Sequence, residues 1–411
     1  MLEKSYSKTS KLVLLFSLFV VTFSLISVVF PALISETVVV SDLERMGITP
    51  YQEDPYQIGP MAIPLILTNG IIFASYLLRN KLGLSSKFEK LLEFQISKKV
   101  AAVIIVIILS GYVVGTIPEL DTKEEFDDFA AIEERVRVAI ITDRLTIEDA
   151  IIGNPNYSTI DPHVKYSLLI ISEKVFENIK VIPFLASIIL LLLTFLITEL
   201  ITKNRLAGLI SLILVLQSNI FLSFDTSATY SNFWIVFYLL SLYLVIRVWF
   251  ASPIIFGLSV FCKMLTISFA PMSMFFIFNS DIPKNQKIII ISGMISLLVI
   301  GGIVFLGTQE SDKLELFKMD RFWEGFTSFA FQMRLDQITI LFLIPLIFGL
   351  FLSSKKNKHA NSISILIAGI LLSGPLLAGI TDQTNQPYRF MSIIVFFAVG
   401  VGILFPKIKQ I

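Results

Sequence analysis

The longest apolar runs of this chain decide what it can fold into. Residues 181–201 read VIPFLASIILLLLTFLITELI and hold one charged residue, Glu199. A helix needs about 20 apolar residues to cross the hydrocarbon core of a bilayer. Comparable runs occur at 12–32, 59–78, 100–117, 206–222, 231–249, 288–306, 336–353, 361–381 and 388–405. The chain is also 55% hydrophobic and only 16% charged, which is more apolar surface than a soluble domain of this length can bury. The sequence therefore predicts an all-α, polytopic membrane protein of about 11–12 transmembrane helices.

Basic residues predict the orientation of these spans, because Lys and Arg gather in short cytoplasmic loops. The N-terminal segment and the loop 79–99 are rich in lysine, whereas 33–58 is acidic and 118–180 is long. We therefore expect the first two segments inside and the last two outside. Both termini are expected on the cytoplasmic side of a cell membrane.

The segment 253–278, PIIFGLSVFCKMLTISFAPMSMFFIF, allows two interpretations. A single crossing would leave the basic clusters 355–358 and 407–409 outside, against the charge rule. Two short helices that enter and return keep these clusters inside, which favours a re-entrant helical hairpin with its turn near Lys263. A lysine is costly in lipid, so it is expected to face a polar cavity. The alternative is one tilted span in which Lys263 pairs with a carboxylate.

A dense acidic segment, LDTKEEFDDFAAIEERVRVAI, follows the span 100–117. Its apolar residues recur at spacings of three and four, which predicts an amphipathic helix over 123–141 that lies flat on the membrane surface. The apolar stripe is Phe126, Phe129, Ile132, Val136 and Ile140. The acidic residues at its start, Glu124, Glu125, Asp127 and Asp128, are either a solvated face or candidates for a catalytic carboxylate.

Five short motifs occur in order after this helix: DPHVKYSLL, the IPFLAS that opens a span, NRLAG, GLSVFCK and PYRFMSIIVFF. This order resembles the GT-C superfamily of integral-membrane glycosyltransferases, which includes protein O-mannosyltransferases, aminoarabinose transferases and oligosaccharyltransferases. The resemblance covers about 99–405, which suggests an N-terminal extension with two transmembrane helices over 1–98 and a GT-C-like membrane domain over 99–411. The arginine that the family carries before the proline of the motif RLPS, which opens a span, is missing here, and Lys180 is the nearest base.

The resemblance implies transfer of a sugar from a polyprenyl-phosphate carrier to an acceptor at the outer membrane face. Such a reaction needs a carboxylate to take the acceptor's proton and cations to hold the phosphate. The catalytic candidates are the four acidic residues Glu124, Glu125, Asp127 and Asp128. The substrate-binding candidates are His163, Lys165, Asp225, Lys263, Tyr388 and Arg389.

The sequence is also compatible with two other functions. One is a non-catalytic GT-C-like membrane subunit, and the other is a secondary transporter, although ionisable groups inside the spans are scarce and no duplication is visible. Carboxylates suit a divalent metal, but no ligand spacing defines a metal site, so cofactor use stays open. The expected partners are membrane lipid and a lipid-linked sugar, without nucleic acid. The sequence identifies neither protein partners nor the sugar.

Overall fold

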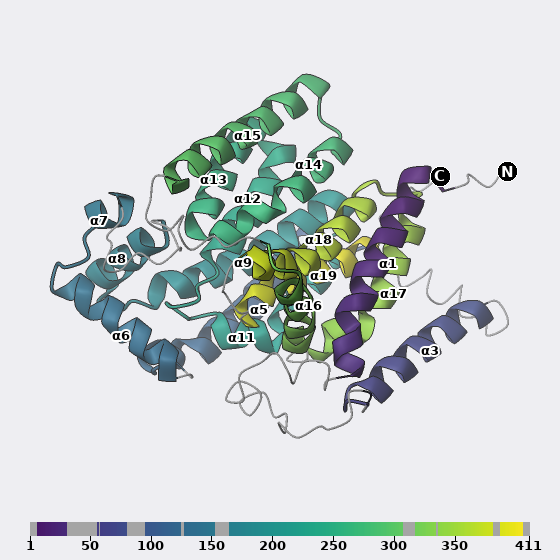
Figure 1. Ribbon diagram of the computed structural model, residues 1–411, viewed down its shortest axis with the longest axis horizontal. Coiled ribbons are helices and arrows are strands. Elements are labelled where there is room, and N and C mark those ends of the chain that lie inside the picture. The colour runs from purple at the N-terminus through teal and green to yellow at the C-terminus, as the bar shows by residue number, and fades with distance from the viewer. Residues whose placement is uncertain are drawn as a thin grey trace. The chain divides into compact units, whose positions relative to one another are not determined.

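The computed structural model of the chain describes residues 6–30, 56, 58–79, 95–124, 127–152, 164–306, 317–333, 336–380 and 387–405. These residues form helices and loops without a β-strand (Figure 1), which confirms the all-α class. Contacts divide the chain into two compact units, Met1–Phe94 with Gln309–Ile411, and Gln95–Thr308. The first unit joins the N-terminal helices to the C-terminal segment by their contacts, and the division into an N-terminal extension over 1–98 and a GT-C-like domain over 99–411 stays a prediction.

Length and composition allow four of the described helices to cross a membrane. These are Lys8–Ile26, Lys98–Asp121, Val181–Thr202 and His359–Ile380. Seven other apolar helices have 10 to 17 residues. A 15-residue helix spans only about 22 Å at 1.5 Å per residue, which is less than a bilayer core of about 30 Å.

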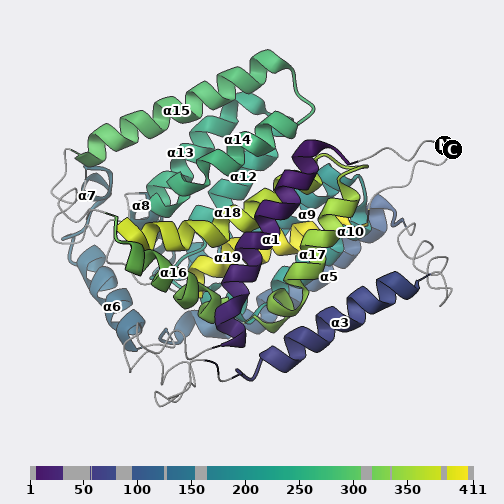
Figure 2. The ribbon, with the colours of Figure 1, turned by 45° about the vertical axis from the view of Figure 1, so that its right-hand side comes forward.

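The first unit contains α1 (Lys8–Val29), α3 (Ala62–Leu78), α16 (Met319–Gln332), α17 (Gln337–Ser353), α18 (His359–Ile380) and α19 (Met391–Ile403). Helix α1 packs against α16, α17 and α18, and α3 packs against α17 (Figure 2). A Cβ atom on Gly325 of α16 would lie 2.7 Å from the Cα of Pro375 and 2.8 Å from the Cβ of Ala378. Helices α16 and α18 therefore approach so closely that only glycine fits at this position.

Hydroxyl groups join α1 to α18 in this unit. The Ser364 hydroxyl donates to the Ser17 oxygen at 2.9 Å, and both residues are buried. Closer to the start of both helices, the Asn361 amide donates to the Ser10 hydroxyl at 2.9 Å. Small polar residues at such positions let membrane helices pack closely and satisfy one another's hydrogen bonds.

The second unit contains α5 (Lys98–Thr116), α6 (Asp127–Ile141), α7 (Ile147–Ile152), α8 (Val164–Phe176), α9 (Val181–Thr202), α10 (Arg205–Leu216), α11 (Asn219–Phe224), α12 (Phe233–Arg247), α13 (Ser252–Cys262), α14 (Ala270–Asn279) and α15 (Lys284–Leu306). Helices α9 and α10 join through a tight turn in which Lys203 has φ 59° and the Asn204 side chain caps α10. A Cβ on Gly208 would lie 2.7 Å from the Phe195 ring, so this glycine permits close packing of the two helices.

Two predicted helix boundaries are wrong. The span predicted over 206–222 is two helices, because α10 ends at Leu216 and the Ser218 hydroxyl accepts the N–H of Phe221 to begin α11. The acidic helix was predicted from residue 123, but Lys123 and Glu124 are not helical and α6 begins at Asp127. A 3₁₀ turn, Ile117–Asp121, instead continues α5 toward the acidic segment.

Helix α12 runs along α13 in the opposite direction. The Ser259 hydroxyl of α13 donates to the Trp234 carbonyl of α12 at 2.8 Å. Further along α12, the Tyr238 ring lies 6.3 Å from that of Phe256, which comes earlier in α13. As one helix advances, the contacts on the other move backward.

Helix α14 runs along α12 in the same direction. The Trp234 ring lies 5.9 Å from Phe269, just before α14, and the Tyr238 hydroxyl is 2.9 Å from that of Ser273 inside α14. Helices α13 and α14 thus have opposite directions, and the chain between them leaves the α-helix at Lys263, which has extended backbone angles. Helix α15 packs against both of them (Figure 1).

Candidate functional site

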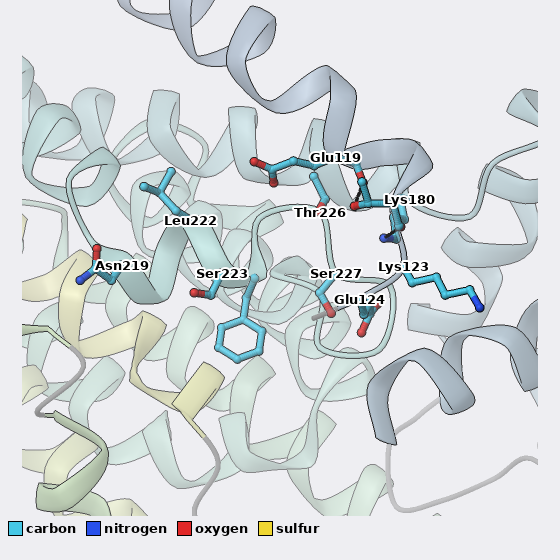
Figure 3. Close-up of a pocket in the computed structure, with 11 residues that line it drawn as sticks. Glu119, Lys123, Glu124, Lys180, Asn219, Leu222, Ser223, Thr226 and Ser227 are labelled. Carbon is cyan, nitrogen blue, oxygen red and sulfur yellow. Dashed lines mark hydrogen bonds between the residues drawn. The ribbon is translucent and has the colours of Figure 1, made fainter. Parts of the chain in front are cut away.

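A polar cavity of about 420 Å³ lies at the end of α5 in the second unit (Figure 3). Its walls come from the 3₁₀ turn after α5, the residue before α9, and α11 with the loop that follows it. The lining residues are Glu119, Thr122, Lys123, Glu124, Lys180, Asn219, Leu222, Ser223, Phe224, Thr226 and Ser227. Carboxylates, lysines and hydroxyls therefore share one cavity, which suits a polar ligand that carries charge.

Lys180 is the buried cation of this cavity, with 2% of its surface exposed. Its ammonium donates a hydrogen bond to the carbonyl of Thr122, and its Nζ lies 3.7 Å from Oε2 of Glu133. Burial raises the pKa of the Glu133 carboxyl, and the charge of Lys180 opposes that rise. A buried lysine beside a cavity is costly to stability, and such charged groups gather at functional sites.

Glu124 is tied to the loop between α11 and α12. Its Oε1 accepts the backbone N–H of Ala228 at 2.8 Å and that of Thr229 at 3.1 Å. Its Oε2 is enclosed and makes no hydrogen bond within the described part of the chain. One carboxylate oxygen therefore holds two consecutive backbone donors of the loop.

Asp225 lies behind the cavity wall and does not line the cavity. It is 1% exposed, and its Oδ2 accepts the hydroxyl of Tyr112 of α5 at 2.7 Å. Burial raises the pKa of Asp225 to about 7, the charge of Glu119 adds to this rise, and the Tyr112 hydrogen bond opposes it. The backbone carbonyl of Asp225 also accepts the Ser187 hydroxyl at 2.7 Å. These two hydrogen bonds anchor the start of the loop in the protein interior. The neighbours of Asp225, Phe224 and Thr226, line the cavity, so Asp225 helps to position the cavity wall.

Lys165, predicted to bind substrate, contacts the same loop from another side. Its Nζ donates to the carbonyl of Thr229 at 2.6 Å. A small cavity of about 20 Å³, room for about one water, lies between Lys165, Glu133 and Thr229. Lys165 is therefore a loop support in this structure.

The other predicted site residues are not among those that line the large cavity. Lys263 is 7% exposed at the break after α13. Tyr388 and Arg389 belong to the first unit, where both are buried and the guanidinium lies 6.0 Å from the Tyr388 ring. Their roles in binding stay predictions.

The remaining candidates fall where the structure describes little or nothing. Glu125 and His163 lie outside the described residues. Asp127 and Asp128 begin α6, and their side chains are likewise outside the description. Among the described residues, no group of three His, Cys, Asp or Glu could hold a metal ion.

Sequence reasoning missed Glu119 and the hydroxyls of Ser223, Thr226 and Ser227, all of which line the cavity. Glu119 could have been noticed, because it is the first acidic residue after the span that α5 forms. The hydroxyls carried no signal, since serine and threonine are common in turns between helices.

Comparison with protein-family models, with curated proteins and with solved structures found no match to this chain.

Proposed function

We propose that the chain is a multi-pass membrane glycosyltransferase of GT-C type. It moves a sugar from a polyprenyl-phosphate carrier to an acceptor hydroxyl at the outer membrane face. The observation that carries this proposal is the cavity at the end of an apolar helix that buried Lys180, Glu119 and Glu124 line together. A cavity at the end of a membrane helix suits a substrate whose tail stays in lipid and whose head is polar.

The reaction that fits these groups is a displacement at the anomeric carbon. The acceptor hydroxyl gives its proton to a cavity carboxylate while its oxygen bonds to the anomeric carbon. The bond from that carbon to the phosphate oxygen breaks, and the electron pair leaves with the phosphate. Lys180 stabilises the negative charge that develops there, because a buried cation acts without reorganising solvent. Carbohydrate hydroxyls find hydrogen-bond partners in Ser223, Thr226 and Ser227.

The membrane arrangement in this proposal has about 11–12 spans, with both termini in the cytoplasm. Helices α13 and α14 form a re-entrant hairpin that enters from the cytoplasmic side and turns at Lys263. Their opposite directions and their lengths of 11 and 10 residues support it, since each leg covers only about half of a bilayer core.

The topology has a direct test. Single cysteines replace Lys284 and Lys356 in a variant whose native Cys262 is serine, and an impermeant maleimide labels each in sealed right-side-out vesicles. We expect both to be labelled only after the membrane is opened. Labelling of one from outside would disprove the hairpin.

The activity is tested with purified protein in nanodiscs, a polyprenyl-phosphate sugar with a radiolabel, and a panel of protein, lipid and glycan acceptors. We expect transfer of label that is lost in Lys180→Met. The matched control is Lys174→Met, which removes an exposed lysine of the same unit. Absence of transfer to every acceptor, together with substrate flux into proteoliposomes, would establish a transporter instead.

A further inference from the structure

The loop over 225–232, which joins α11 to α12, is fixed on three sides. Glu124 accepts two of its backbone N–H groups, and Lys165 donates to the Thr229 carbonyl. From the protein interior, Asp225 accepts the Tyr112 hydroxyl. Within the loop, the Ser227 hydroxyl accepts the N–H of Tyr230 at 2.9 Å. This loop carries Thr226 and Ser227 into the cavity wall, so its conformation sets the shape of the cavity.

Both oxygens of Glu124 are unavailable to a molecule in the cavity. Oε1 is already shared by two N–H donors, and Oε2 is enclosed by protein. A general base must lie within hydrogen-bond reach of the proton that it takes. Glu124 does not meet this requirement in the observed conformation, even though other parts of its side chain line the cavity.

Glu119 has the opposite surroundings. It is exposed, it lines the same cavity, and its carboxylate makes no hydrogen bond or ion pair with any residue in the described ranges. It projects from the 3₁₀ turn that continues α5 (Figure 3). An exposed carboxylate in the wall of a cavity is accessible to an acceptor hydroxyl.

We propose that Glu124 is a positioning residue that holds the 225–232 loop in the cavity wall, and that Glu119 is the carboxylate that takes the acceptor's proton. This inference rests on the proposed function. It assigns separate roles to two glutamates that lie only a few residues apart in the sequence.

The two roles respond differently to glutamine. An amide oxygen still accepts backbone N–H groups, so Glu124→Gln keeps the loop in place, whereas an amide cannot take a proton, so Glu119→Gln removes the base. Truncation to alanine has a third effect, because Glu124→Ala removes the oxygen that accepts the N–H groups of Ala228 and Thr229. These two residues are only 1% and 5% exposed, so water does not readily replace that oxygen.

The experiment measures transfer in nanodiscs for wild type, Glu119→Gln, Glu124→Gln and Glu124→Ala. We expect a loss of about 100-fold or more in kcat for Glu119→Gln. Glu124→Ala should raise KM for the acceptor about tenfold, whereas Glu124→Gln should keep KM close to the wild-type value. Glu148→Gln, an exposed residue of α7, is the matched control for removing one negative charge. Near-normal kcat in Glu119→Gln, or a kcat loss in Glu124→Gln as large as that expected for Glu119→Gln, would overturn the assignment.

A second measurement does not depend on activity. Hydrogen exchange of the amides of Ala228 and Thr229 should accelerate in Glu124→Ala and stay slow in Glu124→Gln. Unchanged exchange in Glu124→Ala would overturn the positioning role. If wild type transfers no sugar to any acceptor, the proposed function fails and the base assignment fails with it, while the exchange measurement still decides the role of Glu124.

Discussion

Polar groups differ in charge between two places in the molecule: the contact of α1 with α18 in the first unit, and the surroundings of the cavity in the second. In the first unit, the Ser17 and Ser364 hydroxyls pair with each other and are neutral. In the second, Lys180, Glu124 and Asp225 are ionisable, and oxygen atoms of both acids are enclosed without a hydrogen bond in the described part of the chain. Neutral pairs satisfy one another, whereas an incompletely paired buried charge destabilises the fold.

This difference separates packing from function. A hydroxyl pair between two helices gives close contact at little cost, and nothing further needs to explain it. Charged groups beside a cavity reduce stability, and such groups gather at sites where they act on a ligand. The cavity of the second unit, rather than the contact of α1 with α18, is therefore the candidate site. The variants below test this contrast from the largest expected effect to the smallest.

Removal of the Lys180 charge should have the largest effect. Lys180→Met keeps most of the side-chain volume, but it removes the cation nearest to Glu133, whose side chain is only 15% exposed, and the ammonium donor of the Thr122 carbonyl. Breaking a buried pair in this way costs about 3 kcal/mol of unfolding free energy. Thermal unfolding in detergent measures this loss.

The matched control is the ion pair between Lys174 and Asp143, whose side chains are 50% and 72% exposed. Lys174→Met should change the unfolding free energy by less than about 0.5 kcal/mol, because solvent screens an exposed pair. If the two methionine variants lose the same stability, then the buried position of Lys180 has no special role.

The pH dependence of Asp225 should give the next largest effect. The pKa of Asp225 is raised to about 7 in the folded protein, so the folded state binds the proton more tightly than the unfolded state. Its contribution to stability is present below the pKa of the unfolded chain and is lost as pH rises through 7. We expect about 2 to 3 kcal/mol of this loss between pH 5 and pH 8.

The comparison variant is Asp225→Asn, which stays neutral and whose amide oxygen still accepts the Tyr112 hydroxyl. Its unfolding free energy should lack this component of the pH dependence, so wild type and variant should differ more at pH 8 than at pH 5. Thermal unfolding across this pH range measures the difference. Parallel pH curves for the two proteins would show that Asp225 does not titrate there.

Apolar runs and loop charges predicted the all-α class and the positions of most helices, because twenty apolar residues in sequence have few other structures available. The basic clusters of the later loops also favoured a turn near Lys263, where the α-helix does end. The break at Ser218 was missed, because apolar residues continue on both sides and only the side-chain cap that begins α11 marks it.

The cavity was harder to predict than the helices. The Glu124 carboxylate meets backbone N–H groups more than a hundred positions away along the chain, as the separation of 104 residues from Ala228 shows. No local pattern encodes such a contact. The sequence identified the acidic segment as a source of carboxylates, but it could not tell that Glu124 faces a loop while Glu119 faces the cavity.

The smallest effect is expected in the first unit. Ser17→Ala removes the hydroxyl that accepts from Ser364 at 2.9 Å, but it leaves no charge unpaired. Hydrogen bonds between membrane helices contribute about 0.6 kcal/mol on average, because the polar groups find other partners when the helices separate. A double-mutant cycle of Ser17→Ala with Ser364→Ala, followed by thermal unfolding, should therefore give a coupling free energy of about 0.6 kcal/mol. A coupling of about 2 kcal/mol or more, on the order of a buried charge pair, would mean that this neutral pair holds its helices as strongly as charge does. The contrast between the α1–α18 contact and the cavity would then no longer separate packing from function.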